Sequence, residues 1–185
     1  MSTSEVAPLV ATGFPVLGVA AWSGTGKTTL LEALLPALQE RGLKVGVIKH
    51  AHHTFEVDTP GKDSYQLRKA GASPMLVASH QRYALMQETP GQEEPDLNHL
   101  LTLMAPHTPD LVIVEGFKAW PLPKLVVYRQ EVGDPAILDD NGVCAAALKR
   151  TDIRPLSKTV ARLDIDDVPG IAEWVHGFMR RQEYL

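Results

Sequence analysis

The residues best suited to chemistry in this sequence stand at positions 21–29, Ala-Trp-Ser-Gly-Thr-Gly-Lys-Thr-Thr. The ending Gly-Lys-Thr is typical of a phosphate-binding loop, although Ala21 stands where the strict pattern has its first glycine. In such a loop, backbone N–H groups surround an anionic phosphate, and the N-terminus of the following helix adds partial positive charge. Gly24 and Gly26 permit the close approach and the positive φ angles that this arrangement needs.

Two side chains of this loop are assigned to the phosphates and to a metal ion. Lys27 can reach the β- and γ-phosphates, and the Thr28 hydroxyl can bind a Mg²⁺ ion that also contacts phosphate oxygens. Lys27 is also assigned to catalysis, because it steadies the phosphates. The nucleotide-binding residues predicted within the loop are Ser23, Gly24, Thr25, Gly26, Lys27, Thr28 and Thr29.

Carboxylates elsewhere in the chain are candidates for catalysis and for metal binding. Glu115 directly follows an apolar run at 111–114, where an acid of a phosphate-loop protein reaches Mg²⁺. Glu115 is therefore predicted to be both catalytic and metal-binding. Asp58 and Asp63 lie in a long polar segment, from which either could approach Mg²⁺ or position a water. We assign Asp58 to catalysis and Asp63 to the metal, with a helix cap as the alternative for Asp63.

Three further residues are predicted to contact the nucleotide. Lys49 follows an apolar run at 45–48, and Lys62 lies in the long segment, where it could touch phosphate or be solvated. The Asp152 carboxylate could accept hydrogen bonds from guanine N1–H and the 2-amino group, a donor pair that adenine lacks. The usual Asn-Lys-x-Asp signature is absent, because Lys149 stands three positions before Asp152. A turn acid or a helix cap is the alternative for Asp152.

Histidines and arginines contribute less to the prediction. His50, His52 and His53 are too crowded on one short loop to complete a tetrahedral zinc site, so a hydrogen-bonding role near the nucleotide or a partner is favoured. Arg68 and Arg82 are possible phosphate contacts, and surface charges are the favoured interpretation. No arginine of the sequence is identified as one that stabilises a transferring phosphate, so we expect hydrolysis to be slow.

Strands and helices mostly alternate along the chain. This pattern predicts an α/β, three-layer P-loop NTPase fold, with a mostly parallel sheet and helices on both faces. Helices are expected to begin near Thr28, Asp63, Asp96 and Pro169, and Gly42 and Gly71 to end the first two. Strands are expected at 16–20, 45–48, 75–79, 83–86, 111–114, 125–128 and 143–148.

The 185 residues suffice for one domain with a substantial core. We expect residues 1–13 to be a flexible N-terminus and 14–185 to form a single domain. The net charge is −4 without a block of like charge, which argues against nucleic acid as the main partner. No apolar run reaches membrane-spanning length, and the first residues lack the features of a signal peptide. We therefore expect a cytoplasmic protein.

Four stretches together resemble the molybdopterin-guanine dinucleotide biosynthesis protein B (MobB) family. They are residues 20–30, 47–53, 57–72 and 114–118. The phosphate loop is common to many families, whereas the histidine-rich stretch and the run Asp-Thr-Pro-Gly-Lys-Asp-Ser-Tyr are far more specific. The resemblance extends over residues 14–182.

The resemblance implies a GTP-binding adapter of the molybdenum cofactor pathway, built as a homodimer. Such proteins bind GTP with Mg²⁺, hydrolyse it slowly, and assist the guanylyltransferase MobA, with molybdoenzyme maturation proteins as further partners. By this match Lys27 and Thr28 contact phosphate and Mg²⁺, and Glu115 is the acid after the central strand. Asp152 falls in the family's Ser-Asp segment, where Thr151 replaces the serine.

Two other functions remain open from the residues alone. An ATP-dependent kinase for a small metabolite would need an arginine-rich lid, whereas the arginines here are scattered. A scaffold would use the nucleotide only to stabilise a dimer or a docking surface.

Overall fold

The computed structural model describes residues 8–51 and 55–182. Two compact units make up the chain. The first consists of Met1–His50 with Asp96–Leu185, and the second, Ala51–Pro95, is inserted between these two segments. The sequence did not indicate this division, and the prediction of a single domain over 14–185 stays a prediction.

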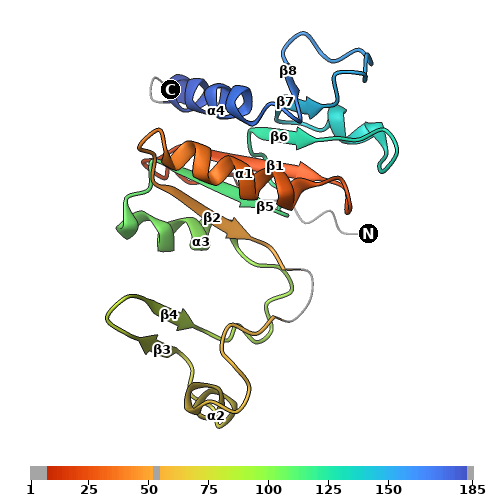
Figure 1. The fold of residues 1–185 in the computed structure, drawn as a ribbon. Coiled ribbons are helices and arrows are strands. Elements are labelled where there is room, and N and C mark those ends of the chain that lie inside the picture. The colour runs from red at the N-terminus through yellow and green to blue at the C-terminus, as the bar shows by residue number, and fades with distance from the viewer. Residues whose placement is uncertain (1–7, 52–54, 183–185) are drawn as a thin grey trace. The chain divides into compact units, whose positions relative to one another are not determined.

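The first unit contains a six-stranded sheet in which all neighbouring strands run parallel (Figure 1). The order across the sheet is β2 (Val45–Lys49), β5 (Leu111–Glu115), β1 (Val16–Ala21), β6 (Lys124–Val127), β7 (Val143–Leu148) and β8 (Ala161–Asp164). Because the strands are parallel, their carboxyl ends meet at one edge of the sheet, which is where ligands bind in such folds. The predicted parallel α/β architecture is confirmed.

Helices cover both faces of this sheet. On one face α1 (Lys27–Gln39) and α4 (Val168–Gln182) pack over alternate residues of β1, such as Leu17 and Val19. On the other face lie α3 (Leu97–Met104), followed by η1 (Ala105–His107), and the short helix η2 (Pro135–Asp139). Burial on both faces explains why the central strands read as continuous apolar runs.

The predicted helix ends are largely confirmed. Gly42 follows α1 with a φ of 80°, and its N–H donates to the Gln39 carbonyl at 2.9 Å. Gly71, with a φ of 113°, ends α2 (Asp63–Lys69) in the same way. Asp96 caps α3 by accepting a hydrogen bond from the Asn98 N–H at 2.9 Å. The cap proposed for Asp63 is wrong, since Asp63 is the first helical residue of α2 and Lys62 precedes it without a side-chain cap.

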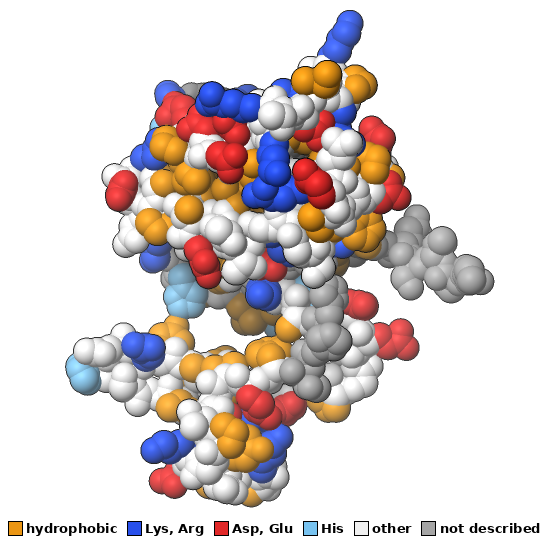
Figure 2. All heavy atoms as spheres, turned by 45° about the vertical axis from the view of Figure 1, so that its right-hand side comes forward, with side chains coloured by type: hydrophobic (Ala, Val, Ile, Leu, Met, Phe, Trp, Pro, Cys, Tyr) orange, Lys and Arg blue, Asp and Glu red, His pale blue; other side chains and the backbone are white. Residues whose placement is uncertain are grey.

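The second unit consists of α2 and an antiparallel hairpin of β3 (Met75–Ala78) and β4 (Tyr83–Met86). None of its described hydrophobic residues is buried. Large hydrophobic side chains stand at its surface (Figure 2), namely Phe55, Val57, Leu67, Leu76, Val77, Tyr83 and Leu85. A two-stranded hairpin is marginally stable alone, so this unit depends on other interactions.

Candidate functional site

The phosphate loop connects β1 to α1 at the carboxyl edge of the sheet. Gly24 and Gly26 adopt φ angles of 79° and 97°, the left-handed region that only glycine enters at little cost. Gly26 is the N-cap of α1 and provides no side-chain cap. The first N–H groups of α1 therefore have no side-chain acceptor from the N-cap residue, and they can bind an anion.

The side chains of the loop divide into those that support it and those that a ligand can reach. Thr25 is 1% exposed, and its hydroxyl donates to the Trp22 carbonyl at 2.7 Å. Thr25 can therefore serve a nucleotide only through its backbone. Ser23, Thr28 and Thr29 are exposed, so the hydroxyl predicted to bind Mg²⁺ is accessible.

Glu115 ends β5 directly beside the loop. Its Oε1 lies 2.9 Å from Lys27 Nζ and 3.8 Å from Lys49 Nζ. The strand register aligns Glu115 with Val19 of β1 on one side and with Lys49 of β2 on the other. The structure thus brings together three predicted site residues from separate parts of the sequence.

The residues present fit a Mg²⁺ ion that is held jointly with phosphate. Among the described residues, no group of three or more His, Cys, Asp or Glu side chains could hold a metal ion. The Thr28 hydroxyl and the Glu115 carboxylate supply oxygen, the donor that Mg²⁺ prefers, and Mg²⁺ keeps several waters and binds phosphates in such sites. The metal would therefore bind together with the nucleotide.

A shallow hollow lies where the chain leaves β6 and β7. Its lining residues are Tyr128, Arg129, Gln130, Glu131, Lys149, Thr151 and Asp152. Two of these residues form an ion pair, with Lys149 Nζ 3.6 Å from Glu131 Oε1. Asp152, the predicted guanine-binding residue, therefore lines a concave surface among groups that can donate and accept hydrogen bonds.

Asp152 is held by its neighbours as an ionised acceptor. Both carboxylate oxygens lie 2.9 Å from Arg154 Nε, and Oδ1 also accepts from the Arg154 N–H at 3.1 Å. Burial alone would raise the pKa of Asp152. The hydrogen bonds and charge of Arg154, with the charge of Arg162, outweigh burial and hold that pKa below its ordinary value. The carboxylate is thus also part of a local turn, the alternative foreseen for it.

Arg129 is a residue of the site that the sequence did not reveal. Its Nε donates to the Thr25 carbonyl of the phosphate loop at 2.8 Å. β6 is a direct neighbour of β1, with Val127 paired to Ala21, so the residues after β6 lie beside the loop. That strand order was the missing signal, since no local motif surrounds Arg129.

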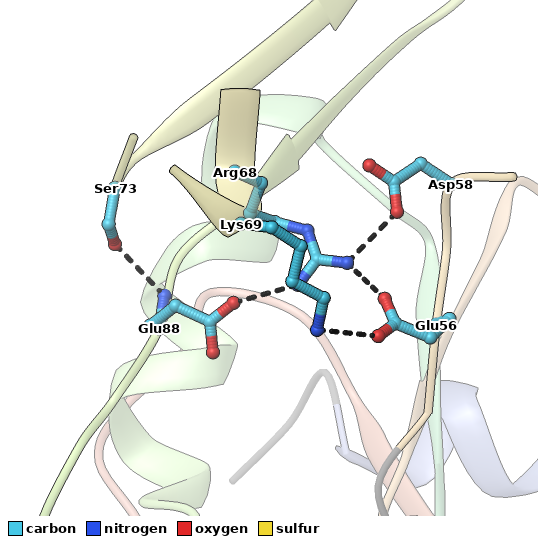
Figure 3. A network of polar contacts seen from close by, with 6 residues as sticks. All are labelled: Glu56, Asp58, Arg68, Lys69, Ser73 and Glu88. Atoms are coloured by element: carbon cyan, nitrogen blue, oxygen red, sulfur yellow. Dashed lines mark hydrogen bonds and ion pairs between the residues drawn. The ribbon is translucent and has the colours of Figure 1, made fainter. Parts of the chain in front are cut away.

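Three predicted residues, Asp58, Lys62 and Asp63, belong to the second unit. Asp58 Oδ1 accepts from Arg68 at 3.0 Å, whereas Lys62 and Asp63 are exposed at the start of α2 (Figure 3 shows the Asp58 contact). Their roles at the nucleotide stay predictions. The interpretation of Arg68 as a surface charge is wrong, because its side chain is 10% exposed and lies among three acids.

The histidine stretch is described only in part. The His50 N–H donates to the Glu115 carbonyl at 2.8 Å, and its ring lies 5.1 Å from the Phe117 ring. A side chain at Gly116, where φ is 97°, would place its Cβ 2.9 Å from His50 Cβ, so a glycine is required there. His52 and His53 lie outside the described residues.

These features define a phosphate-loop protein of the α/β class. The family model "Molybdopterin guanine dinucleotide synthesis protein B" (MobB) matches residues 16–149, and the chain belongs to that family. The resemblance noted from the sequence is confirmed.

Relatives and solved structures agree with this assignment. The "Molybdopterin-guanine dinucleotide biosynthesis adapter protein" of Escherichia coli (strain K12) is 49% identical over 174 residues, covering 92% of this chain and 97% of its own. The protein of the same name from Haemophilus influenzae is 42% identical over 168 residues, covering 89% and 91%. The crystal structure of Bacillus subtilis MobB superposes with a TM-score of 0.71 at 28% identity, covering 90% of this chain and 98% of that one.

Proposed function

We propose that this chain is an adapter in molybdopterin guanine dinucleotide biosynthesis that binds GTP with Mg²⁺ and hydrolyses it slowly. The adapter role is supported by membership of the family and by the names of relatives up to 49% identical. The observation that carries the nucleotide assignment is the contact of Lys27 with Glu115 at the start of α1, beside a loop with two left-handed glycines.

In this proposal the loop N–H groups and Lys27 bind the phosphates. Lys27 is paired with Glu115 at 2.9 Å, so a triphosphate would compete with the carboxylate for the ammonium group. The Glu115 side chain is only 12% exposed, and it would stay paired with Lys49 after Lys27 turns to the phosphates. Its carboxylate would then bind the waters of the metal ion. When bound, Mg²⁺ would neutralise charge on the phosphates. Lys27 would steady the same charge. We assign no residue that orients the attacking water firmly, so we expect hydrolysis to be slow.

Guanine would bind in the hollow after β6 and β7. Asp152 is an acceptor with a lowered pKa, so at neutral pH it is ionised and suited to two N–H donors on one base edge. Lys149, paired with Glu131 at 3.6 Å, borders the same hollow. A site built around a buried acceptor rejects a base without the donors, which favours GTP over ATP.

The partner in this proposal is the guanylyltransferase MobA, which needs GTP to modify molybdopterin, with molybdoenzyme maturation proteins as later partners. The location in this proposal is the cytoplasm. Among the described residues, no helix is long and apolar enough to cross a membrane.

A homodimer formed through the second unit is part of the proposal. The face of the hairpin that carries Leu76, Tyr83 and Leu85 is apolar, and these side chains are 58%, 61% and 55% exposed. A second copy offers the same apolar face, and two-fold contacts between identical faces are self-complementary. Leu85→Lys should convert a dimer to a monomer in sedimentation, and a wild-type monomer would overturn the homodimer.

The experiment that tests the function compares GTP and ATP as competitors of a fluorescent nucleotide, with Mg²⁺ present. We expect GTP to bind at least about tenfold more tightly, and Lys27→Ala to weaken GTP binding by about tenfold or more. Lys158→Ala, a change at an exposed lysine, is the matched control and should bind normally. Unchanged binding by Lys27→Ala would refute the site. Equal or tighter ATP binding would refute the guanine assignment, and substrate-dependent ADP release would identify a kinase.

A further inference from the structure

The segment that follows β6, residues 129–134, makes two hydrogen bonds with the phosphate loop. Arg129 Nε donates to the Thr25 carbonyl at 2.8 Å, and Trp22 Nε1 donates to the Asp134 carbonyl at 3.0 Å. Between them, Val132 Cγ1 lies 3.6 Å from where a side chain at Gly24 would begin. The segment thus holds the loop at Trp22 and at Thr25.

The Arg129 contact fixes one particular peptide group. The Thr25–Gly26 peptide is trans and planar, so its carbonyl and its N–H point in opposite directions. Because the Thr25 carbonyl points to Arg129, the Gly26 N–H points away from Arg129. The N–H of this glycine is one of the groups with which such a loop binds phosphate.

Thr25 itself is held by a second contact within the loop. Its N–H and its hydroxyl both donate to the Trp22 carbonyl, at 3.3 Å and 2.7 Å. With the residue anchored there, the rotation of the next peptide plane depends on what the Thr25 carbonyl binds. Gly26 follows with a φ of 97°, and glycine places little restriction on that rotation.

We propose that Arg129 is a positioning residue of the nucleotide site, which orients the Thr25–Gly26 peptide so that the Gly26 N–H is directed at the bound phosphate. Arg129 also lines the hollow beside Glu131 and Asp152, so it joins the phosphate site to the proposed base site. The inference rests on the proposed function for the nature of the ligand, a polyphosphate.

The test measures binding of inorganic tripolyphosphate and of GTP to the full chain and to Arg129→Met. The methionine keeps the apolar stem and removes the donor. We expect the affinity for both ligands to fall by about tenfold or more, as when a hydrogen bond from a charged group is lost. Arg129→Lys, which keeps a donor on a similar stem, should restore most of the binding. Arg180→Met, at an exposed arginine of α4, is the matched control for loss of one charge.

A nuclear magnetic resonance titration distinguishes positioning from a general structural role. In the wild type the Gly26 amide signal should shift strongly on addition of tripolyphosphate, and in Arg129→Met this shift should be much smaller, with the thermal midpoint unchanged. An unaltered Gly26 shift, or normal binding by Arg129→Met, would overturn the inference. Tripolyphosphate binding without a preference for GTP would refute only the guanine assignment, whereas a wild type that binds no polyphosphate would overturn both.

Discussion

The first unit buries its apolar side chains in three clusters around a parallel sheet, whereas no described hydrophobic residue of the second unit is buried. In place of a core, the second unit has Arg68 bonded to Asp58 and Glu88 at 3.0 Å each and paired with Glu56 (Figure 3). Lys69 adds a contact to Glu56 at 3.2 Å. One chain thus combines a unit organised by hydrophobic burial with a unit organised by ion pairs.

The difference matters because the two interactions respond to different conditions. Apolar burial is non-directional and insensitive to screening, whereas ion pairs at a surface weaken with salt and depend on geometry. The acids around Arg68 favour its charged form, and their hydrogen bonds, from Asp58 first, raise its pKa. Asp58 Oδ2 and Arg68 Nε are buried and make no hydrogen bond among the described residues, so the network is not fully satisfied.

The largest effect is expected from a cavity in the first unit. Leu34 of α1 is 0% exposed within the cluster under α1 and α4, so Leu34→Ala should lower the free energy of unfolding by about 2–5 kcal/mol. Urea unfolding followed by tryptophan fluorescence measures this, since Trp22, Trp120 and Trp174 all belong to the first unit. Leu103→Ala, at a leucine that is 49% exposed, is the control and should change little. A small effect at Leu34 would contradict the role of the core.

Arg68→Met should disrupt the second unit and leave the first intact. It leaves Asp58 and Glu88 without a cation and Glu56 with Lys69 alone, and the Asp58 side chain is only 6% exposed. Hydrogen exchange should show loss of amide protection at 75–78 and 83–86, with no change in β1 or β5. Arg82→Met, at the exposed turn of the hairpin, serves as the control. Retained protection in the hairpin would mean that apolar contacts, not Arg68, hold this unit.

Salt should destabilise the second unit and not the first, and we expect this effect to be smaller than that of Arg68→Met. Raising the ionic strength from about 0.1 to about 1 M shortens the Debye length from about 10 to about 3 Å. Exchange in the hairpin should then become faster, since Glu56 and Glu88 are 41% and 61% exposed, while the urea midpoint of the first unit should not fall. The Arg68→Met hairpin should lose this salt response, and a response that persists there would assign it to other charges.

The smallest effect concerns a carboxylate of the first unit. The pKa of Asp152 is lowered in the folded state, so its contribution to stability is present above its unfolded pKa and is lost as the pH falls through the folded one. The stability gap between wild type and Asp152→Asn should therefore narrow as urea unfolding is repeated from about pH 6 down to about pH 3. Asp166→Asn, at an exposed acid, should show no comparable change. A constant gap would contradict the interaction with Arg154.

The elements predicted from the sequence are those with strong local signals. Continuous apolar runs marked the central strands, and glycines marked the ends of α1 and α2. β8 escaped prediction because Ala-Arg-Leu-Asp alternates charge with apolar residues, and it becomes a strand by pairing with β7. Likewise, η2 begins at Pro135 in a stretch that was not assigned.

The site residues that the sequence predicted are those marked by a local motif or by the end of an apolar strand. The phosphate loop and Glu115 were identified because a motif and a strand end mark them, and their proximity follows from adjacent strands. Arg129 and Arg68 were not identified, since an arginine has the same local pattern whether it is solvated or bonded. Their partners are fixed only by the fold, across 104 positions for Arg129 and Thr25.

The position of the second unit, as an insertion between His50 and Asp96, has a consequence for how this family can vary. The entropy cost of closing a segment grows only with the logarithm of its length, by about 0.6 kcal/mol for each doubling. A longer or shorter insertion would thus change the free energy of folding of the sheet very little. The entropy of chain closure therefore places little limit on the length of the segment between the two parts of the first unit.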